Sequence, residues 1–483
     1  MSAMRLSALI ERDLPADPEV TAVTADSRRV QPGALFVALP GTKVDGRGFV
    51  SAAVEAGAVA VLAGEPLQDV GVPVITVGDP RRAYALAASA LWGAQPRTCV
   101  AITAANGKTS IAVFCRQIFE RLGHRSASMG TLGVQTGDEQ LTPAGLTTPD
   151  AGDVARLLAD LAGRGVTHMA LEASSHGIDQ RRLDGVRLTA AGFTNLTQDH
   201  LDYHGTMGAY RAAKLRLFET LLPRDGTAVL NTDSDAFPAF AASAILSGQS
   251  ILTVGERGEA LALTGRTLAP EGQRLSITAQ GRTYDVSLPL VGAYQASNAL
   301  VAAGLCIAAG EKVEAVLQAL EHIQGAPGRL QRVGAGPRGG EAYVDYAHTP
   351  DGLETVLAAL RPHTKGRLIV VFGAGGDRDR GKRPLMGEIA ARLADIAIVT
   401  DDNPRSEDPA SIRAAILAAA PGAREIGDRG AAIAEAAGLL AEGDVLVVAG
   451  KGHEQGQLVA GITYPFDDVA VTAAALGLET AHA

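Results

Sequence analysis

Apolar and polar positions along this chain repeat in the pattern of alternating strands and helices. Apolar runs of four to seven residues predict strands, and longer stretches with helical spacing predict helices between them. We expect strands at 20–26, 34–39, 58–63, 72–77, 99–103, 166–172, 190–195, 227–231, 342–345, 366–372, 396–400 and 444–449. We expect helices at 49–56, 80–93, 111–122, 153–164, 207–222, 297–309, 352–360, 384–393, 409–419 and 430–440. This alternation predicts an α/β fold in which helices cover both faces of mostly parallel sheets.

The length of the chain divides this pattern into three domains. At about 150 residues per domain, 483 residues exceed what a single core holds. We expect a small N-terminal α/β domain at 1–95 and a central domain at 96–326, whose mostly parallel sheet is of the phosphate-binding-loop type. A C-terminal domain at 327–483 is expected to form a Rossmann-like doubly wound sheet. Pro327-Gly328-Arg329 marks the second boundary, because proline and glycine interrupt regular structure. An antiparallel hairpin is expected around 266–285.

Charge and cysteine content narrow the class of protein. The net charge of −10 argues against a nucleic-acid partner, which requires a basic face. Cys99, Cys115 and Cys306 each lie in an apolar run, which predicts buried free thiols in a reducing compartment. We find neither a signal-peptide pattern nor a stretch of about 18 apolar residues, so we expect a cytoplasmic protein without a membrane span.

The stretch Ala104-Ala-Asn-Gly-Lys-Thr-Ser110 follows the strand at 99–103 and leads into a helix. Strand, short loop, Gly-Lys-Thr and helix form the outline of a phosphate-binding loop, where backbone N–H groups and the helix dipole attract anions. Lys108 would reach the outer phosphates of a nucleotide, and the Thr109 hydroxyl would ligate Mg²⁺. The alternative is an ordinary turn with a solvated lysine, because Gly107 is the only glycine in the loop.

Two more polar stretches follow strands of the central domain. Glu172 stands at the end of an apolar run. Because burying an unpaired carboxylate costs free energy, we expect Glu172 either to lie in a surface turn or to ligate Mg²⁺. The stretch 194–205 contains two histidines and two aspartates within six residues. It is either a solvated loop or a site in which His200 ligates a metal. By composition alone, Lys214 on the following helix is a surface lysine.

Loops of the outer domains also carry candidate chemistry. The composition of the glycine-rich loop at 41–48 favours an ordinary turn. The alternative is that this loop forms a lid over a diphosphate. In that role it would act with Ser27, Arg28, Lys43 and Arg47. In the C-terminal domain, the polar stretches 373–383, 401–405 and 450–454 all follow predicted strands. Ligands bind at the carboxyl ends of strands in doubly wound sheets, so this shared placement indicates a functional site.

Together these motifs resemble those of Mur ligases, an ATP-dependent family that builds the peptide stem of the cell wall. The matching stretches follow the family's order and cover nearly the whole chain. They are Asn106-Gly-Lys-Thr109, Thr147-Thr-Pro-Asp150, Glu172-Ala-Ser-Ser-His176, the stretch 194–204, Pro327-Gly-Arg-Leu-Gln-Arg-Val333 and Asp345-Tyr-Ala-His-Thr-Pro350. The resemblance implies that the three domains bind a UDP-sugar, ATP and an amino acid, in chain order.

The resemblance also implies roles for individual residues. ATP would be bound by Asn106, Gly107, Lys108, Thr109, Ser110, Asn298, Arg329 and Asp345. The UDP-N-acetylmuramoyl dipeptide would be bound by Ser27, Thr147, Thr148, Ser174, Gln180 and Arg182, with the 45–47 loop at its diphosphate. Mg²⁺ would be held by Thr109, Glu172, His200 and Lys214. In this family the lysine that matches Lys214 is carbamylated by CO₂, and the spacing of fourteen residues from His200 fits the family's pattern. Catalysis would rest on Lys108, His200, Lys214 and Arg329.

The C-terminal loops resemble those of the family members that add meso-diaminopimelate to UDP-N-acetylmuramoyl-L-alanyl-D-glutamate in peptidoglycan synthesis. The implied diaminopimelate-binding residues are Arg378, Asp402, Asn403, Arg405, Gly450 and Glu454. Arg378 and Arg405 could bind the distal carboxylate, which lysine lacks, so lysine would leave an arginine unpaired. The D-glutamate carboxylate would attack ATP to give an acyl phosphate, from which the diaminopimelate amine displaces phosphate. We expect small-molecule substrates only, and a monomer.

The sequence departs from the family at two places. Ala104 and Ala105 stand where Gly-Thr is usual, and Gln295 replaces an asparagine near the adenine. A Cβ at Ala104 is tolerable if φ is negative and costs roughly 1–2 kcal/mol if φ is positive. Alternative functions are an L-lysine-adding ligase, a folylpolyglutamate-type ligase and a non-catalytic binder of the muramoyl nucleotide. Arg405 argues against the lysine-adding ligase, and the N-terminal unit argues against the folylpolyglutamate-type ligase. The two alanines in the loop are the reason to consider a non-catalytic binder.

Overall fold

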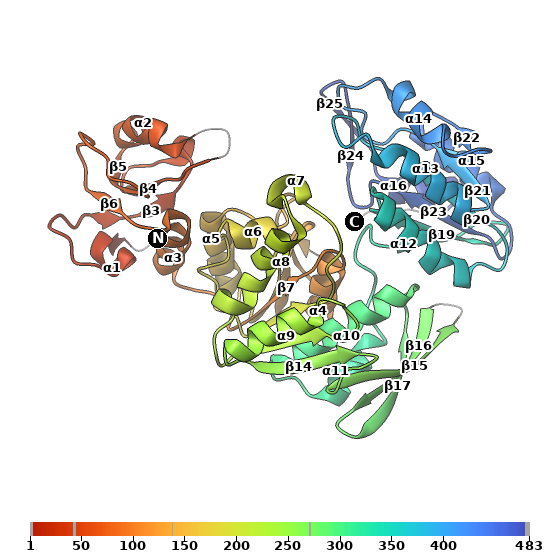
Figure 1. Ribbon diagram of the computed structural model, residues 1–483, viewed down its shortest axis with the longest axis horizontal. Helices are drawn as coiled ribbons and strands as arrows, with labels where there is room; N and C mark the ends of the chain where they lie inside the picture. Colours follow the sequence, from red (N-terminus) through yellow and green to blue (C-terminus); the bar gives the residue numbers. More distant parts are fainter. Residues whose placement is uncertain (1–2, 42–44, 138, 270–271, 479–483) are drawn as a thin grey trace. The chain divides into compact units, whose positions relative to one another are not determined.

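A computed structural model describes residues 3–41, 45–137, 139–269 and 272–478, and Lys43 of the predicted 41–48 loop lies outside them. The chain forms two compact units, whose elements are labelled in Figure 1. Unit 1 comprises Met1–Leu263, Thr278–Arg282 and Leu300–Ala319. Unit 2 comprises Thr264–Ile277, Thr283–Ala299 and Leu320–Ala483.

The N-terminal part of unit 1 is built on a four-stranded parallel sheet in the order β3-β4-β5-β6. Its strands are Ala22–Thr24, Ala34–Ala38, Ala58–Ala63 and Val74–Thr76. The helices α1 (Leu6–Ile10), α2 (Val50–Glu55) and α3 (Pro80–Trp92) and the strand pair β1 (Met4–Arg5) and β2 (Glu19–Val20) complete it. Asp79 caps the N-terminus of helix α3 by accepting a hydrogen bond from the Arg82 N–H. Pro80 suits the first helical position, because the N–H that proline lacks would have no partner within the helix.

The rest of unit 1 surrounds the first eight strands of an 11-stranded sheet, which follow the order β10-β9-β8-β11-β7-β12-β13-β14. Its parallel centre consists of β8 (Ser126–Gly130), β11 (His168–Glu172), β7 (Thr98–Thr103), β12 (Ala190–Phe193), β13 (Thr227–Asn231) and β14 (Ser250–Gly255). The edge strands β9 (Gly133–Thr136) and β10 (Glu139–Gln140) are antiparallel. In register, Glu172 pairs with Ile102, and Phe193 with Thr103. The loops that follow β7, β11 and β12 therefore meet at one edge of the sheet.

Helices connect these strands. They are α4 (Lys108–Arg121), α5 (Ala151–Gly163), α6 (Ser175–Asp179), α7 (Leu201–His204), α8 (Met207–Arg216) and α9 (Phe237–Leu246). The helix predicted at 207–222 ends as an α-helix at Arg216 and continues as a π-helical turn, Leu217–Leu221. Cys99, Cys115 and Cys306 are buried free thiols, which confirms the prediction.

Helix α10 (Ala293–Ala308) spans the division between the units, and α11 (Val313–Leu320) follows it. The strands β15 (Leu261–Ala269), β16 (Gly272–Ala279) and β17 (Arg282–Leu288) are successive neighbours in sheet order, where the sequence predicts a hairpin.

Most of unit 2 is a second sheet in the order β18-β19-β23-β20-β21-β22. Its strands are Gln331–Ala335, Glu341–Asp345, Val445–Ala449, Leu368–Phe372, Ile396–Val399 and Arg424–Glu425 in that order, and only β18 is antiparallel to its neighbour. Along β20, Val370 and Phe372 belong to one core and Ile369 and Val371 to another, so both faces are covered. This is the predicted doubly wound arrangement.

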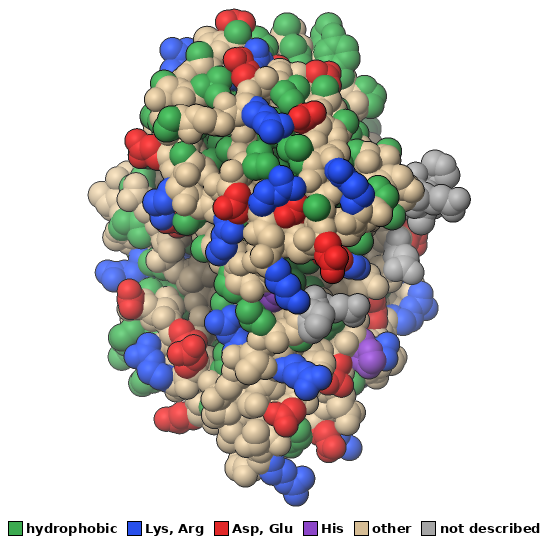
Figure 2. Space-filling model, turned by 90° about the vertical axis from the view of Figure 1, so that its right-hand side faces the viewer, with side chains coloured by type: hydrophobic (Ala, Val, Ile, Leu, Met, Phe, Trp, Pro, Cys, Tyr) green, Lys and Arg blue, Asp and Glu red, His purple; other side chains and the backbone are tan. Residues whose placement is uncertain are grey.

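In the described part of the chain after β18, five α-helices, the 3₁₀ turn Arg361–His363 and a hairpin accompany this sheet, and Figure 1 labels the α-helices and the hairpin strands. The helices are α12 (Pro350–Leu360), α13 (Lys382–Leu393), α14 (Pro409–Leu417), α15 (Arg429–Leu439) and α16 (Asp468–Ala475). The antiparallel hairpin joins β24 (Gly456–Val459) to β25 (Ile462–Pro465) and was not among the predicted elements. None of the described helices is long and apolar enough to cross a membrane. On the face shown in Figure 2, basic and acidic side chains are interspersed.

Candidate active site

The loop after β7 is held in place by the loop after β12. Ala105 N–H donates to the Asn195 carbonyl, Asn106 N–H donates to Asn195 Oδ1, and the Asn195 side-chain amide donates back to the Asn106 carbonyl. Gly107 has a φ of 93° and precedes the first turn of α4. Neither Ala104 nor Ala105 is among the residues with positive φ, so their Cβ atoms introduce no left-handed strain.

Glu172 lies directly beside Thr109. The Thr109 hydroxyl donates to Glu172 Oε2 over 3.0 Å, and the Thr131 N–H donates to Oε1 over 2.9 Å. Glu172 is 3% exposed, so the surface-turn alternative is wrong. Gly130 makes room for the carboxylate, because a Cβ at this position would collide with it. Thr131 and Gly130 were not predicted, since their role depends on a contact far along the chain.

Lys214 is buried, in contrast to the surface lysine that composition favours. It is 1% exposed, its Nζ donates to the Ala104 carbonyl over 2.7 Å, and it lies 4.5 Å from the centre of the Tyr210 ring. Lys108 is half-buried, and its Nζ donates to the same carbonyl over 2.8 Å, so the lysine is held against the loop. Burial, followed by the charge of Lys108, lowers the pKa of Lys214 well below its usual value.

His200 belongs to a cluster of aromatic side chains after β12. Its ring lies 4.8 Å from that of His176 and 6.1 Å from that of Tyr210. Burial lowers the pKa of His200, which favours the neutral imidazole, although the nearby Asp199 carboxylate acts in the opposite direction. A neutral imidazole has the lone pair that a metal requires.

The residues predicted to bind the muramoyl dipeptide lie together, with one exception. Thr148 Oγ1 and Ser174 Oγ are 3.0 Å apart, and Arg182 donates to the Thr148 carbonyl and to Gln180 Oε1. Thr147 Oγ1 lies 3.0 Å from Thr131 Oγ1, next to the Glu172 site. The exception is Ser27, on the 3₁₀ turn Ser27–Arg29. Within the described residues, no hydrogen bond joins it to the others.

In unit 2, Asp345 ends β19 and holds the segment after Pro327. Its carboxylate accepts hydrogen bonds from the Leu330 and Ala347 N–H groups over 2.5 and 2.8 Å. Burial raises the pKa of Asp345 to about 6, although nearby Arg329 acts in the opposite direction. The Arg329 guanidinium lies 4.4 Å from the centre of the Tyr346 ring. These two predicted ATP residues therefore form one local group.

Gln295, which departs from the family pattern, is hydrogen-bonded to a residue of the same helix. Asn298 Nδ2 donates to Gln295 Oε1 over 3.1 Å, and both side chains are buried. The glutamine thus orients the predicted ATP residue Asn298.

The predicted diaminopimelate residues gather after β21 and β23. Asn403 Nδ2 donates to Glu454 Oε2 over 2.9 Å, and the buried Lys451 donates to both side chains. Lys451 was not predicted individually, although it lies within the 450–454 motif. Gly450 has a φ of 123°, and a Cβ there would collide with the Asp402 carboxylate. The buried Asp402 Oδ2 has no hydrogen-bond partner among the described residues, so it can accept a hydrogen bond from a ligand.

Arg405 is fixed by its backbone as well as by its side chain. Its N–H donates to the Leu458 carbonyl, its carbonyl accepts from Ala460 N–H, and its φ is 55°. Its guanidinium donates to the Gly376 carbonyl over 2.9 Å. Arg378 is exposed on the neighbouring loop, with no hydrogen bond recorded to Arg405 within the described part of the chain.

Family models match this chain in three consecutive ranges. They are described as the Mur ligase family catalytic domain at 19–91, the Mur ligase middle domain at 102–306 and the Mur ligase glutamate ligase domain at 328–452. The UDP-N-acetylmuramoyl-L-alanyl-D-glutamate–2,6-diaminopimelate ligase of Caulobacter vibrioides is 70% identical over 98% of both chains. The ligase of the same name from Mesorhizobium japonicum is 54% identical over 97% of both. A solved structure of a ligase with that name covers 99% of both chains at 34% identity and a TM-score of 0.75.

Proposed function

The chain belongs to the Mur ligase family, and on this basis we propose that it joins 2,6-diaminopimelate to UDP-N-acetylmuramoyl-L-alanyl-D-glutamate with ATP. The supporting observation is the group of Asn403, Arg405 and Glu454 at the carboxyl ends of the C-terminal strands. The reaction would be a step of peptidoglycan precursor synthesis in the cytoplasm, carried out by a monomer.

Charge complementarity supports diaminopimelate as the amino-acid substrate. The meso compound carries an ammonium and a carboxylate at its distal end. Arg405 and Arg378 would bind that carboxylate, and Glu454, Asp402 and the Gly450 carbonyl would accept from the ammonium. L-Lysine would leave the anchored Arg405 unpaired, which strongly disfavours it as a substrate.

The donor set in unit 1 suits Mg²⁺ only if Lys214 is modified. Thr109 and Glu172 provide hard oxygen donors within 3.0 Å of each other, and His200 provides a nitrogen. A lysine amine is a poor Mg²⁺ ligand, but its lowered pKa leaves the nitrogen free to attack CO₂. The N–C bond forms as one C=O electron pair of CO₂ moves onto oxygen, the nitrogen releases one proton to solvent, and Lys214 becomes an anionic oxygen donor. Bound Mg²⁺ would then neutralise charge on the ATP phosphates.

The side chains of this chain would act around the transferred phosphoryl group. Lys108, which now donates to Ala104 and Ala105 carbonyls, would turn to the β- and γ-phosphates, with the N–H groups of 106–110 around them. Thr148, Ser174 and Arg182 would hold the D-glutamate carboxylate for attack, giving ADP and an acyl phosphate. The diaminopimelate amine would then form the amide and release phosphate. Arg329, Asn298 and Asp345 remain proposed ATP contacts.

ATP-dependent phosphate release tests the proposal. The full chain would be given UDP-N-acetylmuramoyl-L-alanyl-D-glutamate together with meso-diaminopimelate, L-lysine or no amino acid. Release with diaminopimelate alone is the expected result. Release with lysine would identify the lysine-adding alternative, and activity on a folate with glutamate would identify the folylpolyglutamate type. Binding of the muramoyl nucleotide without any release would identify a non-catalytic binder.

A further inference from the structure

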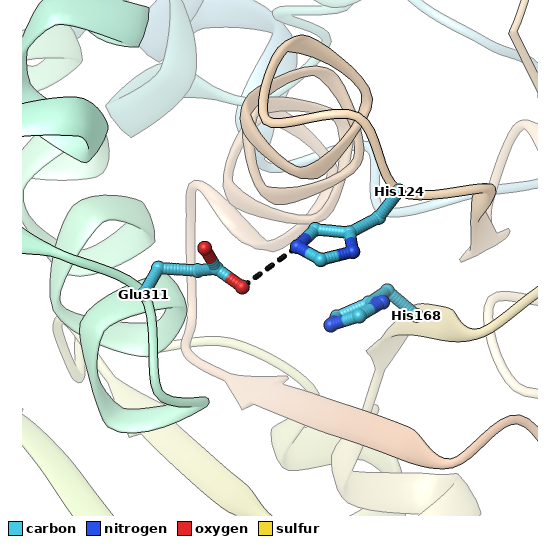
Figure 3. A group of neighbouring side chains, drawn as sticks. All are labelled: His124, His168 and Glu311. Atoms are coloured by element: carbon cyan, nitrogen blue, oxygen red, sulfur yellow. Dashed lines mark hydrogen bonds and ion pairs between the residues drawn. The ribbon is translucent and has the colours of Figure 1, made fainter.

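Three metal-binding side chains meet in unit 1, away from the residues discussed above. His124 follows α4, His168 is the first residue of β11, and Glu311 lies in the turn between α10 and α11. Figure 3 shows the three side chains turned toward one another, and one ligand atom from each lies within 4.8 Å of the others. The group therefore joins three segments that are far apart in the sequence.

The hydrogen bonds of His168 leave its Nε2 with a free lone pair. Thr167 Oγ1 lies 2.9 Å from His168 Nδ1 and 3.3 Å from the Arg125 carbonyl oxygen, and when its proton is donated to that carbonyl it accepts a hydrogen bond from Nδ1–H. The proton of the neutral ring is then on Nδ1. His168 is 2% exposed, so the surrounding side chains hold its ring in place. Metal-ligating histidines typically donate their other ring N–H to a hydrogen-bond acceptor, which fixes the tautomer and the orientation of the ring.

His124 and Glu311 complete the group. His124 Nε2 and Glu311 Oε1 are 2.8 Å apart, and the rings of His124 and His168 have centroids 3.9 Å apart with planes inclined by 31°. A cation would replace the proton that His124 and Glu311 now share. His124 also lines a cavity of about 400 Å³.

We propose that His124, His168 and Glu311 bind a divalent transition-metal cation, with Zn²⁺ as the best match. Two imidazole nitrogens and one carboxylate suit Zn²⁺ and Co²⁺, whereas Mg²⁺ prefers oxygen donors. The site is separate from the proposed catalytic one. It lies at the far ends of α4 and β11, whose other ends carry Lys108 and Glu172. At about 1.5 Å per residue, the 14 residues of α4 separate the two by about 20 Å. The cation would cross-link three segments of unit 1.

Metal titration of the full chain tests this site. After treatment with a chelator, Zn²⁺ would be titrated calorimetrically in excess Mg²⁺, and Co²⁺ would be followed by its tetrahedral absorption. The wild type is expected to bind one equivalent of Zn²⁺ or Co²⁺, and the variants His124→Ala and His168→Ala are expected not to bind it. Zn²⁺ should raise the Tm, because only the folded chain has the site. Thr167→Val should weaken binding about tenfold, because it removes the hydroxyl that orients His168.

Two further variants keep the test decisive. Glu311→Gln preserves the hydrogen bond to His124 but removes the charge, so it should fold and still lose the Zn²⁺-induced rise in Tm. His322→Ala removes an exposed histidine outside the group and should bind like the wild type. Equal Zn²⁺ binding by wild type and Glu311→Gln, or loss of the equivalent in His200→Ala instead, would overturn the proposal. Because the readout is metal binding, the result is independent of ligase activity.

Discussion

Lys108 and Lys214 donate to the same backbone oxygen, the carbonyl of Ala104. Two ammonium groups this close repel each other, and Lys214 is the more deeply buried. The lower-energy arrangement keeps Lys108 charged for phosphate and Lys214 neutral. Burial, followed by the charge of Lys108 on this loop, therefore lowers the pKa of a residue that follows the loop by more than a hundred positions.

Replacing Lys214 by arginine should abolish most of the activity. Arginine stays protonated and cannot form a carbamate, so the site would lose an anionic ligand and gain a buried charge. We expect kcat to fall on the order of 100-fold or more, as for the loss of other groups that stabilise transition-state charge. Phosphate release at saturating substrates measures this effect. The matched control is Lys365→Arg at an exposed lysine, and full activity of Lys214→Arg would exclude the carbamate.

Gly130→Ala should disturb the proposed Mg²⁺ site without changing any proposed ligand. A Cβ would collide with the Glu172 carboxylate and push it away from Thr109. We expect the Mg²⁺ concentration at half-maximal activity to rise and the free energy of unfolding to fall by about 1–3 kcal/mol. Gly163→Ala is the control, since it lies in α5 with open space around it. An unchanged Mg²⁺ requirement in Gly130→Ala would contradict the assignment of Glu172.

The sequence predicts the parallel sheets of this protein better than it predicts which polar groups are buried. Strands such as β7 and β20 are continuous apolar runs, because helices cover both of their faces. Lys214 has no such local signal. Its burial results from the packing of α8 against the loop after β7, and only the resemblance to a family singled it out.

The β24–β25 hairpin was missed for a related reason. All four residues of β25 are exposed, so no apolar alternation indicates a strand. The hairpin is held by main-chain hydrogen bonds to Arg405 and by the Leu458 N–H donating to Asn403 Oδ1. Its contribution to the candidate site became visible only from contacts between distant segments.

Asp345 should make stability depend on pH. Its folded-state pKa of about 6 exceeds the usual 3.8, so the folded chain binds more protons than the unfolded chain between these values. Its contribution is therefore fully present below about pH 4 and is lost as the pH rises through 6, by about 3 kcal/mol in total. Chemical denaturation at pH 4 to 7 measures the slope, and Asp345→Asn should remove that part of it. A slope that is equal in both proteins would show that Asp345 titrates normally.

Arg405→Lys should separate amino-acid binding from the rest of the reaction. A lysine ammonium cannot donate to the Gly376 carbonyl and also bind a carboxylate in the planar geometry of a guanidinium. We expect kcat/KM for diaminopimelate to fall about 10- to 100-fold, which corresponds to one lost charged hydrogen bond, with the KM for ATP unchanged. Arg392→Lys is the control, because its ion pair with Glu354 is exposed and contributes little. If the KM values for ATP and diaminopimelate rose equally, Arg405 would support the fold of unit 2 rather than the binding of the amino acid.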